Sequence, residues 1–123
     1  AIEYKTPTAT GLKLISLATK MAELQKVRET NLGVELSRLG ESAWKILIEL
    51  VIAKEKRNQI SAKDISNRTL LPEAIADRYI NILEDMGHVI RSQHHSSRHE
   101  DRVSLTHNGH SLMRKTLVQL DTI

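Results

Sequence analysis

The side chains best suited to chemistry lie between positions 61 and 106. Arg78 could donate hydrogen bonds to a guanine edge or to a phosphate. Lys63 and Arg68 could contact phosphates, and Arg98 could enter a minor groove. Each of these cations could equally be plain surface charge, where an exposed ion pair contributes little. The residue types indicate nucleic-acid contact and leave ordinary solvated charge as the alternative.

Three histidines, His94, His95 and His99, raise the alternative of a metal site. Neighbouring residues on a strand point to opposite faces, so His94 and His95 would not converge easily on one ion. We therefore expect no metal site. We expect these histidines to gain positive charge as the pH falls through their ordinary pKa of about 6.5. That protonation predicts tighter DNA binding under mildly acidic conditions.

No arrangement typical of an enzyme stands out. Serine, histidine and aspartate all occur, but the sequence contains no nucleophile-elbow motif and no paired carboxylates that can be placed in a cleft. Because the chain has no cysteine, disulfides and thiolate metal sites are excluded. The sequence therefore predicts a protein that is not an enzyme and uses no cofactor.

Two helices joined by a tight turn must position the cations. Ser61 and Asp64 have the spacing of a capping box, which predicts the start of a short helix. Pro72 suits the first turn of a second helix that runs to Met86, and Gly87 suits its left-handed end. We expect the second helix to bury Leu71, Ile75, Tyr79, Leu83 and Met86. Its outward side chains are then Glu73, Ala74, Asp77, Arg78 and Asn81.

A polar hairpin follows directly. The segment 88–91 begins a strand and the segment 101–105 returns as another, with Val103 and Leu105 on one face. Thr106 can cap a last helix that follows the hairpin. The order of helix, turn, helix and hairpin is that of a winged helix-turn-helix.

Upstream of this unit the pattern is helical twice. A helix is expected over 12–31, because its apolar residues recur every three or four positions as Leu14, Leu17, Met21, Leu24 and Val27. A break with a possible short turn is expected over 31–39, followed by a helix over 41–57 that Ser42 can cap and in which Trp44 is a core or inter-helix anchor. The stripe of the first helix could pack on its own domain or on a second copy of the chain, and the pattern leaves both open.

Composition agrees with a small helical protein. The chain has 123 residues, which favours one domain, and 40% of them are apolar while 27% are charged. Aromatic residues are only 2% of the chain, and strands favour aromatic and β-branched residues, so the composition favours helices. No run of about 18 apolar residues occurs, so we expect no membrane span and a cytoplasmic protein.

Charge is distributed unevenly along the chain. Residues 1–57 carry ten Lys/Arg and seven Glu, a net charge of 10 − 7 = +3, whereas residues 61–104 carry six Lys/Arg and seven Asp/Glu, a net charge of 6 − 7 = −1. A near-neutral reading unit weakens the case for tight non-specific DNA binding, which depends on neutralising phosphates. The alternative is a winged helix used as a protein-interaction or dimerisation module with weak or no DNA binding.

Four features then point to a known family. They are the opening Ile60-Ser61-Ala62-Lys63-Asp64-Ile65, the segment 71–89 with Arg78, Leu83, Glu84, Gly87 and Val89, the arginine Arg98, and Leu105-Thr106-x-x-Gly109. From Glu41 to Met113 the chain resembles the MarR-type winged-helix transcriptional regulators. The resemblance covers 73 of the 123 residues.

The resemblance implies a mainly α fold with a small β-hairpin wing, in which N- and C-terminal helices form a homodimer. It implies that helix 72–86 enters the major groove of double-stranded DNA and that wing 91–102 lies at the minor groove. A small phenolic or lipophilic effector often binds between the dimer arm and the reader in such proteins. The expected organisation is a flexible tail (1–11), a dimerisation helix with its connection (12–40), the DNA-binding domain (41–106) and a second dimerisation helix (107–123).

Two features depart from the family pattern. Ser97 stands where the family usually has an aspartate that helps to hold the wing arginine. Glu73 and Asp77 put carboxylates near the start of the reading helix, where they can accept from cytosine amino groups but also repel phosphate. The candidate DNA-binding residues are Ser61, Lys63, Arg68, Thr69, Glu73, Ala74, Asp77, Arg78, Asn81, His95, Ser97 and Arg98.

Overall fold

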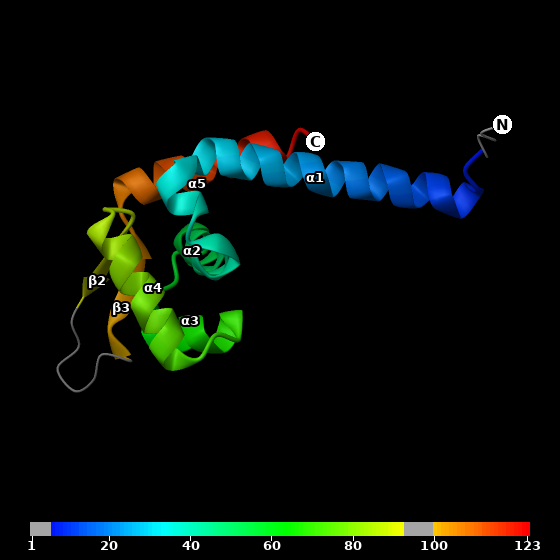
Figure 1. Cartoon of the computed structure of the whole chain (residues 1–123). Helices are drawn as coiled ribbons and strands as arrows, with labels where there is room; N and C mark the ends of the chain where they lie inside the picture. The colour runs from blue at the N-terminus through cyan, green and yellow to red at the C-terminus, as the bar shows by residue number, and fades with distance from the viewer. Residues whose placement is uncertain (1–5, 93–99) are drawn as a thin grey trace.

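The computed structural model describes residues 6–92 and 100–123, and these contain eight elements, one of which is a central helix. In chain order they are α1 (Ala9–Ser37), α2 (Gly40–Glu55), β1 (Ile60–Ser61), α3 (Ala62–Thr69), α4 (Glu73–Asp85), β2 (Val89–Ser92), β3 (Arg102–Leu105) and α5 (His107–Leu120). α1 and α5 lie side by side at one end of the molecule, and α3 and the start of α4 lie at the other end (Figure 1). The predicted mainly helical fold with a small β wing is confirmed.

The central helix is α2. Its buried face carries Ile46, Leu47 and Leu50, each at most 1% exposed. α3, α4, β3 and α5 pack around it. They contribute the buried side chains Ile65, Ile80, Leu83, Val103, Leu105 and Met113. The core is therefore aliphatic, as the scarcity of aromatic residues predicted, and burying each such side chain contributes about 1.5–3 kcal/mol.

Three strands form the small sheet in the described residues, one more than the sequence predicted. The order is β1-β3-β2 and both pairings are antiparallel. β1 pairs only Ile60 with Val103 and Ser61 with Arg102. A strand of two residues is too short for a period-two pattern, which explains why the sequence showed only the hairpin. Because α3 begins immediately after β1, the sheet ties the start of α3 to the wing.

α1 is longer than predicted. It begins at Ala9 because the Thr8 hydroxyl accepts a hydrogen bond from the Gly11 amide at 2.9 Å. Its helical geometry is interrupted at Gly33 (φ 81°, ψ 171°), and a short helical segment continues to Ser37. The predicted break over 31–39 is therefore a kink at one residue, Gly33, with helix on both sides, and the predicted start at position 12 was three residues late.

The predicted cap of α2 was wrong. The N-cap residue is Leu39, which makes no side-chain capping bond, and Ser42 lies inside the helix. Gly40 adopts φ 73°, a left-handed conformation that favours glycine, so the turn into α2 depends on backbone freedom at Gly40. The helix also ends at Glu55, two residues before the predicted Arg57.

The predicted start of α3 was correct. The Ser61 hydroxyl accepts from the Asp64 amide at 3.1 Å, and the Asp64 carboxylate accepts from the Ser61 amide at 2.9 Å. This reciprocal pair satisfies two amides at the start of the helix. It also holds the Asp64 carboxylate ionised, since the Ser61 backbone hydrogen bond lowers the pKa of Asp64 below its ordinary value.

The buried face of α4 differs from the predicted one. Ala76, Ile80 and Leu83 are its buried residues, while Ile75, which the spacing placed in the core, is 38% exposed. Leu71, Tyr79 and Met86 pack partly buried against the core. The prediction placed Ile75 in the core, whereas the buried residue is its neighbour Ala76. The spacing of large apolar residues led to Ile75 and overlooked the small Ala76.

The junction between the wing and α5 explains the Leu105-Thr106-x-x-Gly109 pattern. The Thr106 hydroxyl accepts from the Gly109 amide at 3.0 Å and donates to the Gly87 carbonyl at 2.6 Å. A Cβ atom on Gly109 would lie 2.1 Å from the His88 carbonyl oxygen. That oxygen accepts a hydrogen bond from the Thr106 amide, which holds it in place, so only glycine fits at position 109. The motif therefore joins the start of α5 to the end of α4.

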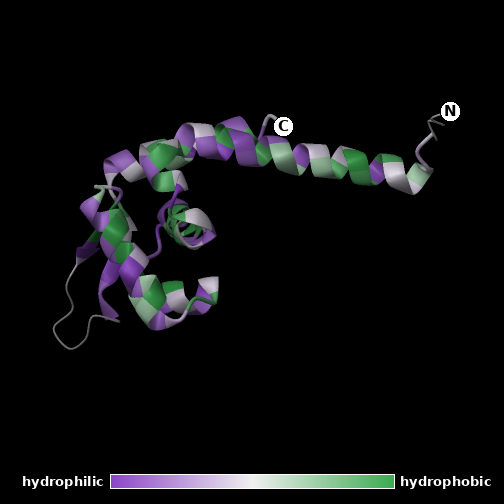
Figure 2. Cartoon of the chain, viewed as in Figure 1, coloured by the Kyte–Doolittle hydropathy of each residue, from purple (hydrophilic) through white to green (hydrophobic). Residues whose placement is uncertain are grey.

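Two further observations concern the whole of the described chain. None of its helices combines the length and apolarity needed to cross a bilayer. Apolar residues also continue along the part of α1 that projects beyond α5, as the green positions in Figure 2 show. Leu12, Leu14, Ile15, Leu17 and Met21 are each at least 55% exposed.

Candidate nucleic-acid interface

A buried arginine joins the wing to α4. The side chain of Arg91 in β2 is 5% exposed, and its guanidinium lies 2.9 Å from a carboxylate oxygen of Asp77 and 3.6 Å from one of Asp101. It also donates to the side-chain oxygen of Asn81 at 3.1 Å, while its backbone amide donates to Glu84 at 3.1 Å. A guanidinium presents several donors in one plane, which suits it to several acceptors at once. Arg91 thus holds α4, β2 and the residue preceding β3 in one arrangement.

This cluster engages two of the predicted DNA-binding residues. The half-buried side chains of Asp77 and Asn81 lie one helical turn apart and both reach Arg91. The Asp77 carboxylate therefore faces a cation of its own chain, which reduces the repulsion that it would exert on phosphate. Their contact with DNA remains a prediction.

Sequence reasoning missed Arg91 and Asp101, although a signal for Arg91 was present. Val89 is buried, and residues two apart on a strand share a face, so Arg91 had to point inward with it. A buried arginine needs acceptors, and Asp77, Asn81 and Glu84 follow one another at spacings of four and three along the facing helix.

The exposed side chains at the start of α4 form a second group. Glu73, Ala74, Ile75 and Arg78 are exposed, and they lie in the first two turns of the helix. We call these four residues the reading face. The N-terminal residues of the second helix of a helix-turn-helix are those that contact base edges. Three of the four were predicted, and Ile75 was not.

The predicted residues of α3 divide into two kinds. Lys63 and Arg68 are exposed, and Arg68 lies 4.0 Å from the Glu49 carboxylate. Ser61 and Thr69 are buried, with their hydroxyls bonded inside the protein: Ser61 caps α3, and Thr69 donates to the Ile65 carbonyl at 2.6 Å. Lys63 and Arg68 are therefore exposed enough to contact phosphate. For all four residues, contact with DNA remains a prediction.

The remaining predictions concern residues outside the described part of the chain. His95, Ser97 and Arg98, predicted to contact DNA, lie there, as do His94 and His99. Within residues 6–92 and 100–123, no group of three or more His, Asp or Glu side chains is gathered closely enough to hold a metal ion.

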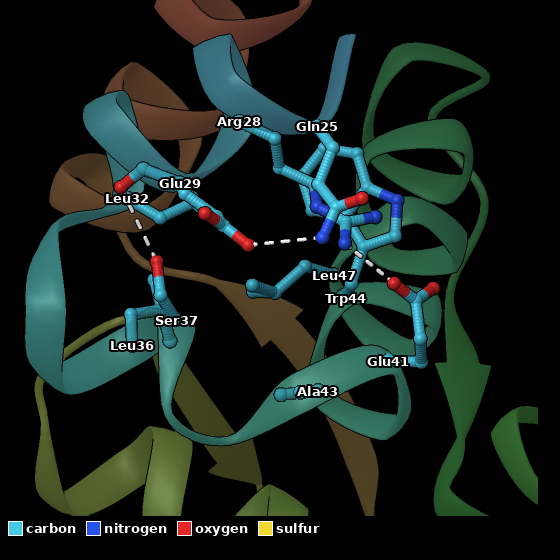
Figure 3. A pocket seen from close by; sticks show the side chains of 11 residues that line it. Gln25, Arg28, Glu29, Leu32, Leu36, Ser37, Glu41, Ala43, Trp44 and Leu47 are labelled. Carbon is cyan, nitrogen blue, oxygen red and sulfur yellow. Dashed lines mark hydrogen bonds and ion pairs between the residues drawn. The ribbon is translucent and has the colours of Figure 1, made fainter. Parts of the chain in front are cut away.

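A separate cavity lies between α1 and the start of α2. The guanidinium of Arg28 stands over the ring of Trp44, 5.1 Å from its centroid, and pairs with Glu41 (Figure 3). One cavity of about 170 Å³ lies beside this group, reaching down to Leu47. A larger one of about 580 Å³ shares Arg28, Glu41 and Trp44 and is bounded by Met21, Ala22, Leu24, Gln25 and Leu120. An aromatic ring, aliphatic walls and an ion pair are a lining suited to a small aromatic or amphipathic molecule.

Comparison with known proteins supports the fold. Neither a protein-family model nor a curated protein sequence matches the chain. NadR in complex with 4-hydroxyphenylacetate superposes with a TM-score of 0.66 at 15% identity, over 99% of this chain and 80% of NadR. MepR of Staphylococcus aureus bound to ethidium bromide gives 0.70 at 13% identity, over 94% and 76% of the two chains. AF1382 from Archaeoglobus fulgidus gives 0.61 at 17% identity, over 70% and 93%.

These similarities confirm the winged-helix fold that the sequence predicted. MepR is described as a transcription regulator of the multidrug efflux pump MepA. At such low identities the shared fold does not by itself transfer a function from these proteins to this chain.

Proposed function

We propose that this chain, which has the winged-helix fold of MarR-type regulators, is a sequence-specific DNA-binding transcription regulator that acts as a homodimer. The observation that carries the proposal is the reading face. α4 presents exposed side chains, Arg78 among them, beside a wing that Arg91 holds against the same helix. In this proposal α4 enters the major groove of double-stranded DNA and the wing 91–102 lies at the minor groove.

The dimer would form through the two helices that lie away from the reading face. The projecting part of α1 carries an exposed apolar patch that extends from Leu12 to Met21. Monomeric proteins rarely expose a contiguous apolar patch of this kind to solvent. The side-chain amide of Asn31 in α1 donates a hydrogen bond to the side-chain oxygen of Gln119 in α5 at 2.8 Å. This bond links α5 to α1 just after the part of α1 that projects beyond α5. We therefore keep the proposed division into an N-terminal arm (12–40), a DNA-binding domain (41–106) and a C-terminal helix (107–123).

A small-molecule effector would bind in the cavity at Trp44. NadR and MepR were each solved with a small aromatic-containing molecule, and the cavity here has an aromatic and aliphatic lining. It lies between α1, which belongs to the proposed dimer arm, and α2, on which the reading unit packs. A ligand that bound there more tightly in one arrangement of arm and reader would shift DNA affinity.

The second candidate function is a protein-interaction module without DNA binding. The observation that favours it is the net charge of −1 over residues 61–104. Such a unit attracts phosphates only through placed cations, chiefly Lys63, Arg68 and Arg78 among the described residues.

A titration against DNA separates the two functions. The protein is mixed with a pool of random double-stranded DNA fragments, and binding is recorded as a function of salt concentration. We expect affinity to fall steeply with salt, and Arg78→Ala to weaken binding to the selected sites by about tenfold or more, the effect of losing one placed arginine contact. Arg38→Ala serves as the control, because Arg38 is exposed between α1 and α2, away from the reading face. No binding at low salt contradicts the regulator and favours the interaction module.

A further inference from the structure

The reading face contains an apolar pair that no core requires. Ala74 is exposed and Ile75 is 38% exposed, and both lie in the first turn of α4. The buried positions of this helix are Ala76, Ile80 and Leu83. Ile75 precedes Ala76 by one residue, so its side chain points about 100° away from that of Ala76 around the helix. The isoleucine therefore lies at the border of the buried face and turns part of its surface outward.

Two polar residues of the next turns are engaged within the protein. Asp77 and Asn81 reach Arg91 of β2, at 2.9 Å and 3.1 Å. After Glu73, the exposed residues of the reading face are Ala74, Ile75 and Arg78. The chemistry of these three residues is that of two apolar groups next to one cation.

Apolar side chains recognise one group in the major groove. The C5-methyl group of thymine is the apolar feature that base pairs display there, and it distinguishes A·T pairs from G·C pairs by contact with apolar side chains. We infer that Ile75, together with Ala74, contacts thymine methyl groups and thereby selects A·T pairs opposite the first turn of α4. This inference rests on the proposed function, and it adds which bases this part of the protein selects and which residue selects them.

The size of the effect follows from the area that a methyl group hides from water. Removing one buried methyl group from such a contact weakens binding about fourfold. Replacing thymine by deoxyuridine removes only that methyl group and leaves every hydrogen-bonding group of the base in place. Comparison of the two bases therefore isolates the apolar contact from the arginine and phosphate contacts.

The experiment uses the full chain and a DNA site selected from the random pool. Dissociation constants are measured for that site with thymine and with deoxyuridine, placed one position at a time. The proteins are the unmodified chain, Ile75→Ser and the matched control Ile52→Ser. Ile52 is 39% exposed on α2, so it has the same residue type and exposure but lies outside the reading face. The readout is the ratio of the two dissociation constants within each protein, which cancels any change in stability.

The expected result is a loss of about fourfold at one or two thymine positions for the unmodified chain and for Ile52→Ser, and a ratio near one for Ile75→Ser. Ile75→Val, which keeps two methyl groups, should retain the thymine preference. Ile75→Ala, which removes most of the apolar side chain, replaces Ile75→Ser if the serine variant does not fold. Equal affinity for thymine and deoxyuridine at every position, with salt-dependent binding intact, overturns the inference and leaves the proposed function standing. Absence of DNA binding at low salt overturns both.

Discussion

Arg91 of β2 and Asp77 of α4 form an ion pair of 2.9 Å in which the arginine is 5% exposed. Because Arg91 lies on a strand and Asp77 on a helix, the ion pair fixes the position of β2 relative to α4. Asp101, 4% exposed at its side chain, lies on the other side of the same guanidinium at 3.6 Å. Removing the cation would leave these carboxylates facing one another in a region with little water.

Arg91→Ala should therefore reduce the free energy of unfolding by about 3 kcal/mol, the usual cost of breaking a buried pair from one side. Urea denaturation followed by circular dichroism measures it. Arg102→Ala is the control, because Arg102 is exposed on β3 and its loss should change stability by less than about 0.5 kcal/mol. Equal stability of the two variants would contradict the role assigned to Arg91.

The exposed stripe of α1 predicts the oligomeric state. Leu14→Glu combined with Leu17→Glu places two charges on the proposed interface, so the chain should sediment as a monomer where the unmodified chain sediments as a dimer. DNA affinity should fall as well, since one protomer then binds one half-site. Lys13→Glu changes the charge of the same turn without touching the stripe and should remain dimeric. A monomeric unmodified chain at micromolar concentration would contradict the dimer.

The cavity at Trp44 predicts a fluorescence response. Trp44 is the only tryptophan of the chain, so its emission reports the surroundings of this one ring, which lines the larger cavity. A small aromatic ligand should change the emission with saturation, and Ala22→Phe, which fills the larger cavity from α1, should abolish the change. Ala18→Phe is the control, because Ala18 lies one turn earlier on α1 and does not line the cavity. A saturable response that persists in Ala22→Phe would place the ligand elsewhere.

The capping box of α3 predicts a pH dependence. The Ser61 amide lowers the pKa of Asp64 in the folded state, so the ionised carboxylate stabilises the fold above its unfolded value of 3.8, and this stabilisation is lost as the pH falls through the folded pKa. Asp64→Asn should thus be about 1 kcal/mol less stable than the unmodified chain near neutral pH. Denaturation at several pH values should show the difference shrinking below pH 4. Asp85→Asn, on the exposed end of α4, controls for a general effect of charge. A difference that is constant with pH would contradict the capping role of the carboxylate.

The local features of the fold could be predicted because their causes lie within a few residues of one another. The Ser61–Asp64 box, the left-handed Gly87 and the Thr106 cap each depend on hydrogen bonds or backbone freedom over three or four positions. Such signals do not depend on how the rest of the chain packs. They placed α3, α4, the hairpin and α5 in order, and with them the winged-helix fold and most of the reading face.

The arrangement of side chains across elements required the tertiary structure. The Arg91 cluster joins residues from α4, β2 and the position just before β3, and β1 exists only because β3 pairs with it. Either Ile75 or the adjacent Ala76 could have packed against α2 and α3, and the structure buries Ala76 and leaves Ile75 partly exposed. Periodicity alone cannot distinguish two adjacent apolar residues. The sequence by itself determined which helices and turns form. The packing decided which charged side chains form ion pairs inside the protein and which side chains stay exposed on the reading face, because burial and ion pairing depend on contacts between segments far apart in the chain.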